Sequence, residues 1–146
     1  MRKQFLNPKD VFDPGFLFTH TVAVSGAMKL VYVSGQVSYD SKAAVVGKGD
    51  MRAQTEQVFA NLTRNLKSAG ADWGDVIKLN GYMVGMNPEA VKAYRQVRSR
   101  YLDPVKLPAS TLVGVDRLVH EDLLLEVEVV AAVAEKRRAT KRKKKR

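Results

Sequence analysis

Apolar and polar residues alternate along two early segments, which is the pattern of β-strands with one buried face. The segments span 16–24 and 29–37, with Ser25-Gly26-Ala27 between them. Within the second segment, the period-2 alternation divides the residues between two faces, with Leu30, Tyr32 and Ser34 on one face and Val31, Val33 and Gly35 on the other. We therefore expect a hairpin with Gly26 in its turn.

Two later segments have the helical period instead. Between Asp50 and Gly70, apolar residues recur at spacings of three and four, Asp50 is a good N-cap, and Gly70 stands where helices usually end. A second helix begins at Asn87, which a proline and a glutamate follow, as is typical of a first helical turn. Its apolar stripe continues to Leu102, and Pro104 then ends it.

Three more β-rich segments complete the chain, at 75–84, 109–118 and 123–133. The element order is therefore ββαβαββ, which favours an α+β fold with one mixed sheet and both helices on one face. Residues 1–15 are predicted to form an irregular N-terminal arm, because prolines, aspartates and a glycine separate its aromatic residues. A single domain over 16–134 fits this length.

The charge of the chain is concentrated at one end. The formal net charge is +10, but residues 135–146 hold nine Lys or Arg and one Glu, so the remaining chain carries only +2. The basic tail therefore says nothing about the fold. Two interpretations of it stay open: a disordered, solvated extension, or a salt-sensitive contact with nucleic acid. The second would use its terminal run of Lys141, Arg142, Lys143, Lys144, Lys145 and Arg146.

Composition narrows the chemistry. The chain of 146 residues has no cysteine, so disulfides, thiolate nucleophiles and cysteine-containing metal sites are excluded. Its two histidines, His20 and His120, have no partner at metal-ligand spacing, and no glycine-rich phosphate loop follows a strand. We therefore expect no metal and no cofactor. No signal peptide or membrane-spanning run is recognisable, so we expect a cytoplasmic location without membrane contact.

One pair of carboxylates has two interpretations. Glu126 and Glu128 share a face of a strand that is otherwise built from leucine and valine. They could simply mark the wetter side of the sheet. Alternatively, one of them could stand at the mouth of a pocket and hold a water molecule or a ligand donor.

A series of short motifs, in order across all predicted elements, resembles the RidA/YjgF family, also called the L-PSP endoribonuclease family. The resemblance covers about residues 18–133, and its specificity comes from the ordered series rather than from one motif. The matching residues are Val33 to Gln36, Arg52 to Thr55, Gln57, Asn61-Leu62, Ala69 to Ala71, Asp75 to Lys78, Pro108 to Thr111, Val113 to Val115, Arg117-Leu118 and Leu125 to Glu128.

The resemblance implies a chorismate-mutase-like fold and homotrimers whose sheets surround a central barrel. A five-stranded sheet with strands apolar on both faces would also expose a large patch unless copies associate. The family typically hydrolyses enamine or imine intermediates to a 2-keto acid and ammonia, without cofactor, in clefts between subunits. By position, the glutamate that holds the attacking water is Glu126, and the substrate-binding positions are Ser34, Gly35, Ser110, Leu112 and Phe18.

The sequence departs from this family at the carboxylate-binding position. The family has an arginine where this chain has Ser110, and a cysteine where it has Leu112. A serine hydroxyl cannot replace the bidentate, charged fork of a guanidinium, and losing such a contact costs about 1.5–3 kcal/mol. Three functions therefore stay open: an altered 2-iminobutanoate/2-iminopropanoate deaminase, a non-catalytic trimer that binds a small metabolite, and an RNA-associated protein or endoribonuclease that acts through its basic tail.

Overall fold

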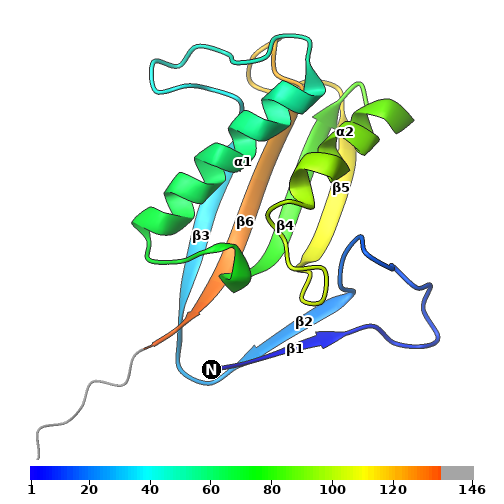
Figure 1. Cartoon of the computed structure of the whole chain (residues 1–146), viewed down its shortest axis with the longest axis vertical. Coiled ribbons are helices and arrows are strands. Elements are labelled where there is room, and N and C mark those ends of the chain that lie inside the picture. The colour runs from blue at the N-terminus through cyan, green and yellow to red at the C-terminus, as the bar shows by residue number, and fades with distance from the viewer. Residues whose placement is uncertain (136–146) are drawn as a thin grey trace, which may run out of the picture.

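A computed structural model describes residues 1–135 and shows a four-stranded sheet with two helices on one face (Figure 1). The strands lie in the order β3-β6-β4-β5, and β4 runs parallel to β5 but antiparallel to β6. The expected α+β fold, with a mixed sheet and both helices on one face, is confirmed. The elements are β1 (Arg2–Leu6), β2 (Thr21–Ser25), β3 (Met28–Gln36), α1 (Met51–Ser68), the 3-10 turn η1 (Trp73–Asp75), β4 (Val76–Val84), α2 (Pro88–Arg98), β5 (Ala109–Val115) and β6 (Leu125–Ala134).

The two helices begin where their caps predict. The Asp50 carboxylate accepts the Ala53 amide at 3.0 Å, and the Asn87 side chain accepts the Ala90 amide at 2.9 Å. After α1 the chain turns through Gly70 at φ +68°, a conformation that glycine adopts without a steric cost. The helix α2 ends at Arg98, before the end of the predicted apolar stripe, which continues in the following turn.

The core lies between α1 and the sheet. One face of α1 packs on β3 and β6, and alternate residues of the central strands β4 and β6 point toward the helices. On β6 the buried set is Leu125, Val127 and Val129, so Glu126 and Glu128 face the other way, as predicted. The fully buried core side chains include Val58, Phe59, Leu62, Leu66, Leu79 and Met83.

A buried glutamine ties two loops to the start of α1. The side chain of Gln54 has no exposed surface. Its amide donates to the carbonyls of Gly47 (3.2 Å) and Asp122 (2.7 Å), and its Oε1 accepts the Leu124 amide at 2.8 Å. Because both the donor and the acceptor are satisfied, this polar side chain is accommodated in the core and fixes the chain just before β6.

The N-terminal region differs from the prediction. Residues 1–15 are not irregular throughout, because β1 pairs with every residue of β2 in an antiparallel ribbon. The expected hairpin is also wrong: Gly26 does turn the chain, at φ +91°, but β2 pairs with β1 while β3 pairs with β6. Strand β1 was not predicted because one of its two inward side chains is Lys3, whose ammonium donates to the Gly74 carbonyl at 3.0 Å.

The sheet face opposite the helices is mixed rather than apolar. It carries Glu126 and Glu128 from β6, a lysine, an asparagine and a tyrosine from β4, and the largely exposed Tyr32 from β3. The premise that both faces are apolar is therefore wrong. The strand β5 ends three residues earlier than expected, and β6 begins two residues later, since 116–124 forms turns. Within residues 1–135, neither helix is long and apolar enough to span a bilayer.

Candidate functional site

A cavity of about 270 Å³ beside α2 brings together three of the residues proposed from the sequence. Phe18, from the loop before β2, faces Ser110 and Leu112 of the edge strand β5. The rings of Phe12 and His20 pack edge-to-face against the Phe18 ring, with centroid distances of 6.0 and 5.3 Å. His20 itself lies just before β2 and bonds the Phe12 carbonyl through Nε2 at 2.8 Å, so it orders this loop.

The helix α2 adds a cation to this cavity. Arg98 lines it and is only 6% exposed, yet its Nε and Nη2 are buried without a hydrogen-bond acceptor among the described residues. No carboxylate within residues 1–135 forms an ion pair with it. Burial lowers the pKa of Arg98, because desolvation disfavours the charged guanidinium. Arg98 is therefore a desolvated cation without an anionic partner among residues 1–135.

A tyrosine one turn earlier on α2 stands in the same environment. Tyr94 is 3% exposed, and its hydroxyl has no hydrogen-bond partner among the described residues. Burial raises the pKa of Tyr94 to about 12, so the phenol stays protonated and can donate a hydrogen bond. The hydroxyl lies against Gly81, where a Cβ would be 3.5 Å from it and 2.9 Å from Leu112 Cδ1. The glycine thus makes room for both side chains.

A second, mainly apolar cavity of about 350 Å³ adjoins the first. Leu17, Arg95 and Arg98 line both. Its remaining wall comes from the end of α2, the loop before β5 and the N-terminal segment, through Phe16, Ser99, Leu102, Pro104 and Leu107. Arg98 therefore lines both cavities, and Ser110 and Tyr94 give the first one polar groups that the second lacks from these residues.

The other predicted residues lie on the open face of the sheet. Glu126 extends over Gly35, and a Cβ on that glycine would be 2.7 Å from the carboxyl carbon. Within residues 1–135, Glu126 accepts no hydrogen bond. Glu128 differs, because its Oε1 accepts from Asn80 Nδ2 at 2.9 Å and from the Tyr82 hydroxyl at 3.0 Å. This hydrogen bond raises the pKa of Tyr82. Among the described residues, Glu128 is thus engaged by two donors and Glu126 by none, which leaves Glu126 available to a water or a ligand.

Ser34 lies near Glu128 on the open face. It shares a shallow open-face hollow of about 250 Å³ with Tyr32, Asn80 and Glu128. A register shift in the β3–β6 pairing occurs between Val33 and Gln36, which moves Ser34 and Gly35 out of the regular ladder. Such a bulge re-aims side chains and exposes backbone groups near a site.

One chain does not bring all the predicted site residues together. Ser110 pairs in register with Leu79, a core residue, so it faces the helices, whereas Glu126 faces away from them. The two residues also lie on different strands, with β4 between them. The structure thus contains two half-sites: Phe18, Ser110 and Leu112 on the helix side, and Ser34, Gly35 and Glu126 on the open side.

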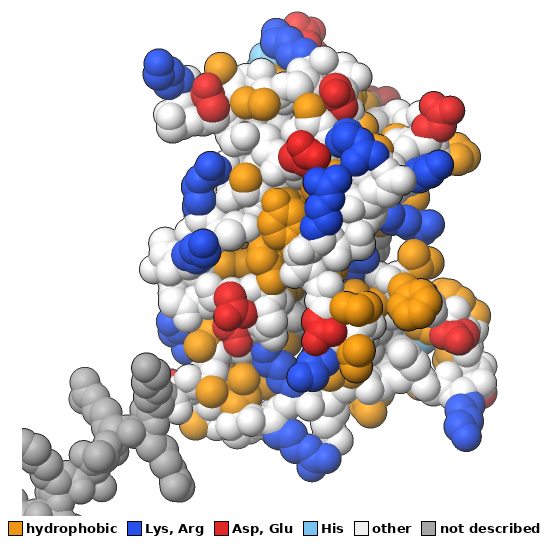
Figure 2. Space-filling view, viewed as in Figure 1, with side chains coloured by type: hydrophobic (Ala, Val, Ile, Leu, Met, Phe, Trp, Pro, Cys, Tyr) orange, Lys and Arg blue, Asp and Glu red, His pale blue; other side chains and the backbone are white. Residues whose placement is uncertain are grey.

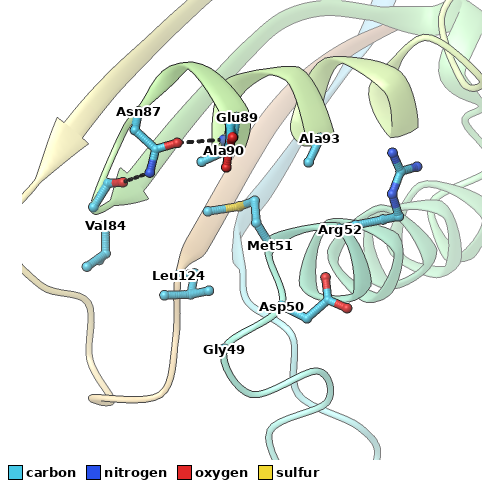
Figure 3. A pocket seen from close by; sticks show the side chains of 11 residues that line it. Gly49, Asp50, Met51, Arg52, Val84, Asn87, Glu89, Ala90, Ala93 and Leu124 are labelled. Carbon is cyan, nitrogen blue, oxygen red and sulfur yellow. Dashed lines mark hydrogen bonds between the residues drawn. The ribbon is translucent and has the colours of Figure 1, made fainter.

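A further cavity, of about 630 Å³, lies where the first turns of α1 and α2 meet (Figure 3). Asp50 and Asn87 line it, but their side chains already cap the helix amides, so those donors are not free for an anion. Arg52 also lines it and donates to Gln96, outside the cavity lining. None of the residues proposed from the sequence lines this cavity.

A larger cavity, of about 750 Å³, is lined by Gly35 and by side chains of α1 that include Gln57 and Asn61. Charges of both signs are dispersed over the helix-covered face rather than gathered in one patch (Figure 2). Among residues 1–135, no three histidine or acidic side chains cluster in a way that could hold a metal ion. The proposed nucleic-acid contacts, Lys141 to Arg146, lie outside the described residues.

Two contributors to the helix-side cavity were missed from the sequence. Tyr94 falls within the predicted apolar stripe of the second helix, and neither it nor Arg98 was proposed as a site residue. The helical period does give a signal, since Val91, Tyr94 and Arg98 are spaced three and four apart and therefore share one face. An arginine that continues an apolar stripe is thus a sequence sign of a buried cation.

Comparison with known proteins agrees with this fold. The family model "Endoribonuclease L-PSP" matches residues 17–133. A RutC family protein of Pyrococcus horikoshii is 36% identical over 105 residues, 72% of this chain and 80% of the relative. A 2-iminobutanoate/2-iminopropanoate deaminase of Dermatophagoides farinae is 26% identical over 103 residues, 70% and 77% of the two chains. A solved Rid family protein of Yersinia pestis superimposes with a TM-score of 0.80 at 33% identity, over 91% of this chain and 100% of that one. The chain therefore belongs to the endoribonuclease L-PSP family, also called RidA/YjgF.

Proposed function

We propose that the protein is a cytosolic homotrimer that binds a small 2-imino acid between copies and hydrolyses it to the 2-keto acid and ammonia. The observation that carries the proposal is the unpaired Glu126 carboxylate, held over Gly35 while its neighbour Glu128 is engaged by two donors. A carboxylate without a protein donor can accept a hydrogen bond from water and orient it.

The reaction that this arrangement supports has two stages, addition of water and loss of ammonia. Water adds to the imine carbon, with Glu126 accepting a proton from it, and the C=N bond becomes a C–N single bond. That proton passes to nitrogen and gives the carbinolamine. The hydroxyl proton then moves to nitrogen through Glu126, the C–N bond breaks, ammonia leaves, and the C=O double bond forms. One water is consumed and one ammonia is released, with no change of oxidation state. Positioned acid–base groups of this kind typically contribute about 10²–10⁴-fold in rate.

The placement of the two half-sites supports a cleft between copies. β3 and β5 are the two edge strands of the sheet, and each carries residues of a different half-site. A head-to-tail contact that sets β5 of one copy beside β3 of the next joins the halves, and such a contact closes into a ring when its rotation permits. A deaminase name among the relatives is consistent with this reaction.

The test is an ammonia-release assay with 2-iminopropanoate or 2-iminobutanoate generated in place by an amino-acid-consuming enzyme. The wild type should accelerate release above the spontaneous rate, and Glu126→Gln should lower that acceleration about a hundredfold. Glu128→Gln is the matched control, because a glutamine oxygen can still accept from Asn80 and Tyr82.

Each outcome has a definite meaning. A wild type that leaves the spontaneous rate unchanged would refute the enzymatic proposal and favour a non-catalytic binding protein. Equal losses in the two glutamine variants would show that the open face matters for folding or assembly rather than through Glu126.

A further inference from the structure

We infer that Arg98 is the carboxylate-binding residue of this protein, and that its ligand is a small organic acid whose apolar side chain occupies the cavity next to that residue. The inference rests on the buried guanidinium and the two cavities that Arg98 lines. It deepens the proposed function by naming how the acid is held and which side chain it carries.

The charge of Arg98 has no ion-pair partner among the described residues, and a bound anion would compensate it. Removing an isolated guanidinium from water costs several kcal/mol unless an opposite charge or acceptors compensate. Neither cavity that Arg98 lines contains an aspartate or glutamate, and the other charged residue in both linings is a second cation, Arg95. Among the described residues of one chain nothing compensates this costly buried cation, and a bound anion would do so.

The surrounding donors suit a carboxylate. The hydroxyl of Ser110 lines the same cavity as Arg98, and so does Tyr94, whose buried hydroxyl lacks a partner. A guanidinium fork with neighbouring hydroxyl donors is the arrangement that binds the two oxygens of a carboxylate with fixed geometry. Arg95, which is exposed, adds positive charge at the rim.

The adjoining cavity indicates what the acid carries. It holds about 350 Å³, and its lining is dominated by apolar side chains, including Leu17, Leu102 and Leu107. Burial of a ligand's methyl and methylene groups there contributes about 0.8 kcal/mol for each group. A branched or aromatic side chain gains from this cavity, whereas a one-carbon side chain cannot reach it. We therefore infer a preference for bulky apolar acids.

The experiment measures binding by calorimetry and uses three probes. 4-Methyl-2-oxopentanoate has both the carboxylate and a branched side chain, pyruvate lacks the branched side chain, and 4-methylpentan-2-one replaces the carboxylate by a methyl group. The wild type should bind the first probe at least tenfold more tightly than either of the others. Arg98→Met should weaken binding of 4-methyl-2-oxopentanoate roughly ten- to a hundredfold and leave the neutral ketone unaffected.

Arg100→Met is the matched control, since Arg100 is exposed and pairs with Glu56 at 3.2 Å outside both cavities. Thermal unfolding supplies a second readout. Replacing an uncompensated buried charge by an apolar residue of similar length should raise the Tm of the ligand-free protein, whereas removal of a structural arginine would lower it. Lost carboxylate binding together with an unchanged or higher Tm is thus the expected result for Arg98→Met.

Unchanged binding of 4-methyl-2-oxopentanoate in Arg98→Met would overturn the inference, as would an equal loss in Arg100→Met. Tighter binding of pyruvate than of the branched acid would refute the assigned side-chain class. These results are independent of turnover, because a 2-keto acid is not hydrolysed. Absence of imine hydrolysis with Arg98-dependent binding would therefore refute the proposed reaction alone.

Discussion

Substitution of Gly35 by alanine should displace the proposed water-holding carboxylate without unfolding the protein. A Cβ at this position would lie 2.7 Å from Cδ of Glu126 and 2.9 Å from its Cγ. Carbon atoms in contact prefer about 3.5–4.0 Å, so the carboxyl group would have to move by about 1 Å. The backbone of Gly35 does not need a positive φ, so alanine can adopt it without strain.

The expected loss follows from that displacement. A misplacement of about 1 Å at a reacting group can cost on the order of 10²-fold in rate. We expect Gly35→Ala to lower kcat/KM for imine hydrolysis by about that factor. Its Tm should stay close to that of the wild type, because the side chain that moves is half-buried rather than part of the core.

The assay is ammonia release, with a crystal structure of the variant to locate the Glu126 carboxyl group. Gly114→Ala is the control, because its new methyl group would meet nothing closer than Met86 Cβ at 3.4 Å. Full activity of Gly35→Ala, with Glu126 visibly displaced, would refute the role of that carboxylate. An unmoved Glu126 would refute the steric argument itself.

Three other predictions concern stability, the tail and assembly. Gln54→Leu removes three buried hydrogen bonds and should lower the free energy of unfolding, measured by urea titration, by about 2–4 kcal/mol. The control, Gln96→Leu at an exposed position, should change that free energy by less than about 0.5 kcal/mol. Truncation after Ala134 should leave the Tm unchanged and abolish any salt-sensitive RNA affinity measured by fluorescence anisotropy, since the removed segment carries +8; retained affinity would assign that binding to the domain. Light scattering should give the mass of a homotrimer, and a stable monomer would contradict the cleft between copies.

Elements with strong local signals were predictable. The capping residues Asp50 and Asn87 located the starts of both helices, and the alternation along β6 placed Glu126 on the open face. The pairing of β2 was not predictable, because strand partners are set by contacts between distant segments. Its partner β1 has a short and partly polar pattern, with the inward-facing Lys3 bonded to η1 rather than to solvent.

The site was predictable only in part, because its geometry also depends on contacts between segments that are distant in the sequence. A list of positions by resemblance cannot tell which of them meet within one chain and which lie on opposite faces of a sheet. Gln54, Gln57 and Asn61 are among the residues that match the family. In the structure, the side chains of all three donate hydrogen bonds to backbone carbonyls of loops and so position those loops. The helical spacing indicates that Arg98 is buried, but its lack of a partner among the described residues depends on distant contacts that no sequence pattern records.

The division of the site across the two faces of the sheet has a genetic consequence. If each cleft takes Arg98 from one copy and Glu126 from the next, then Arg98→Met and Glu126→Gln damage different halves of it. Two inactive alleles, one with each substitution, should complement one another when co-expressed, because mixed rings contain clefts in which both halves are intact. In a ring that also contains wild-type chains, each substituted chain damages one cleft and leaves the other cleft that it borders intact, so neither allele should inhibit the wild type.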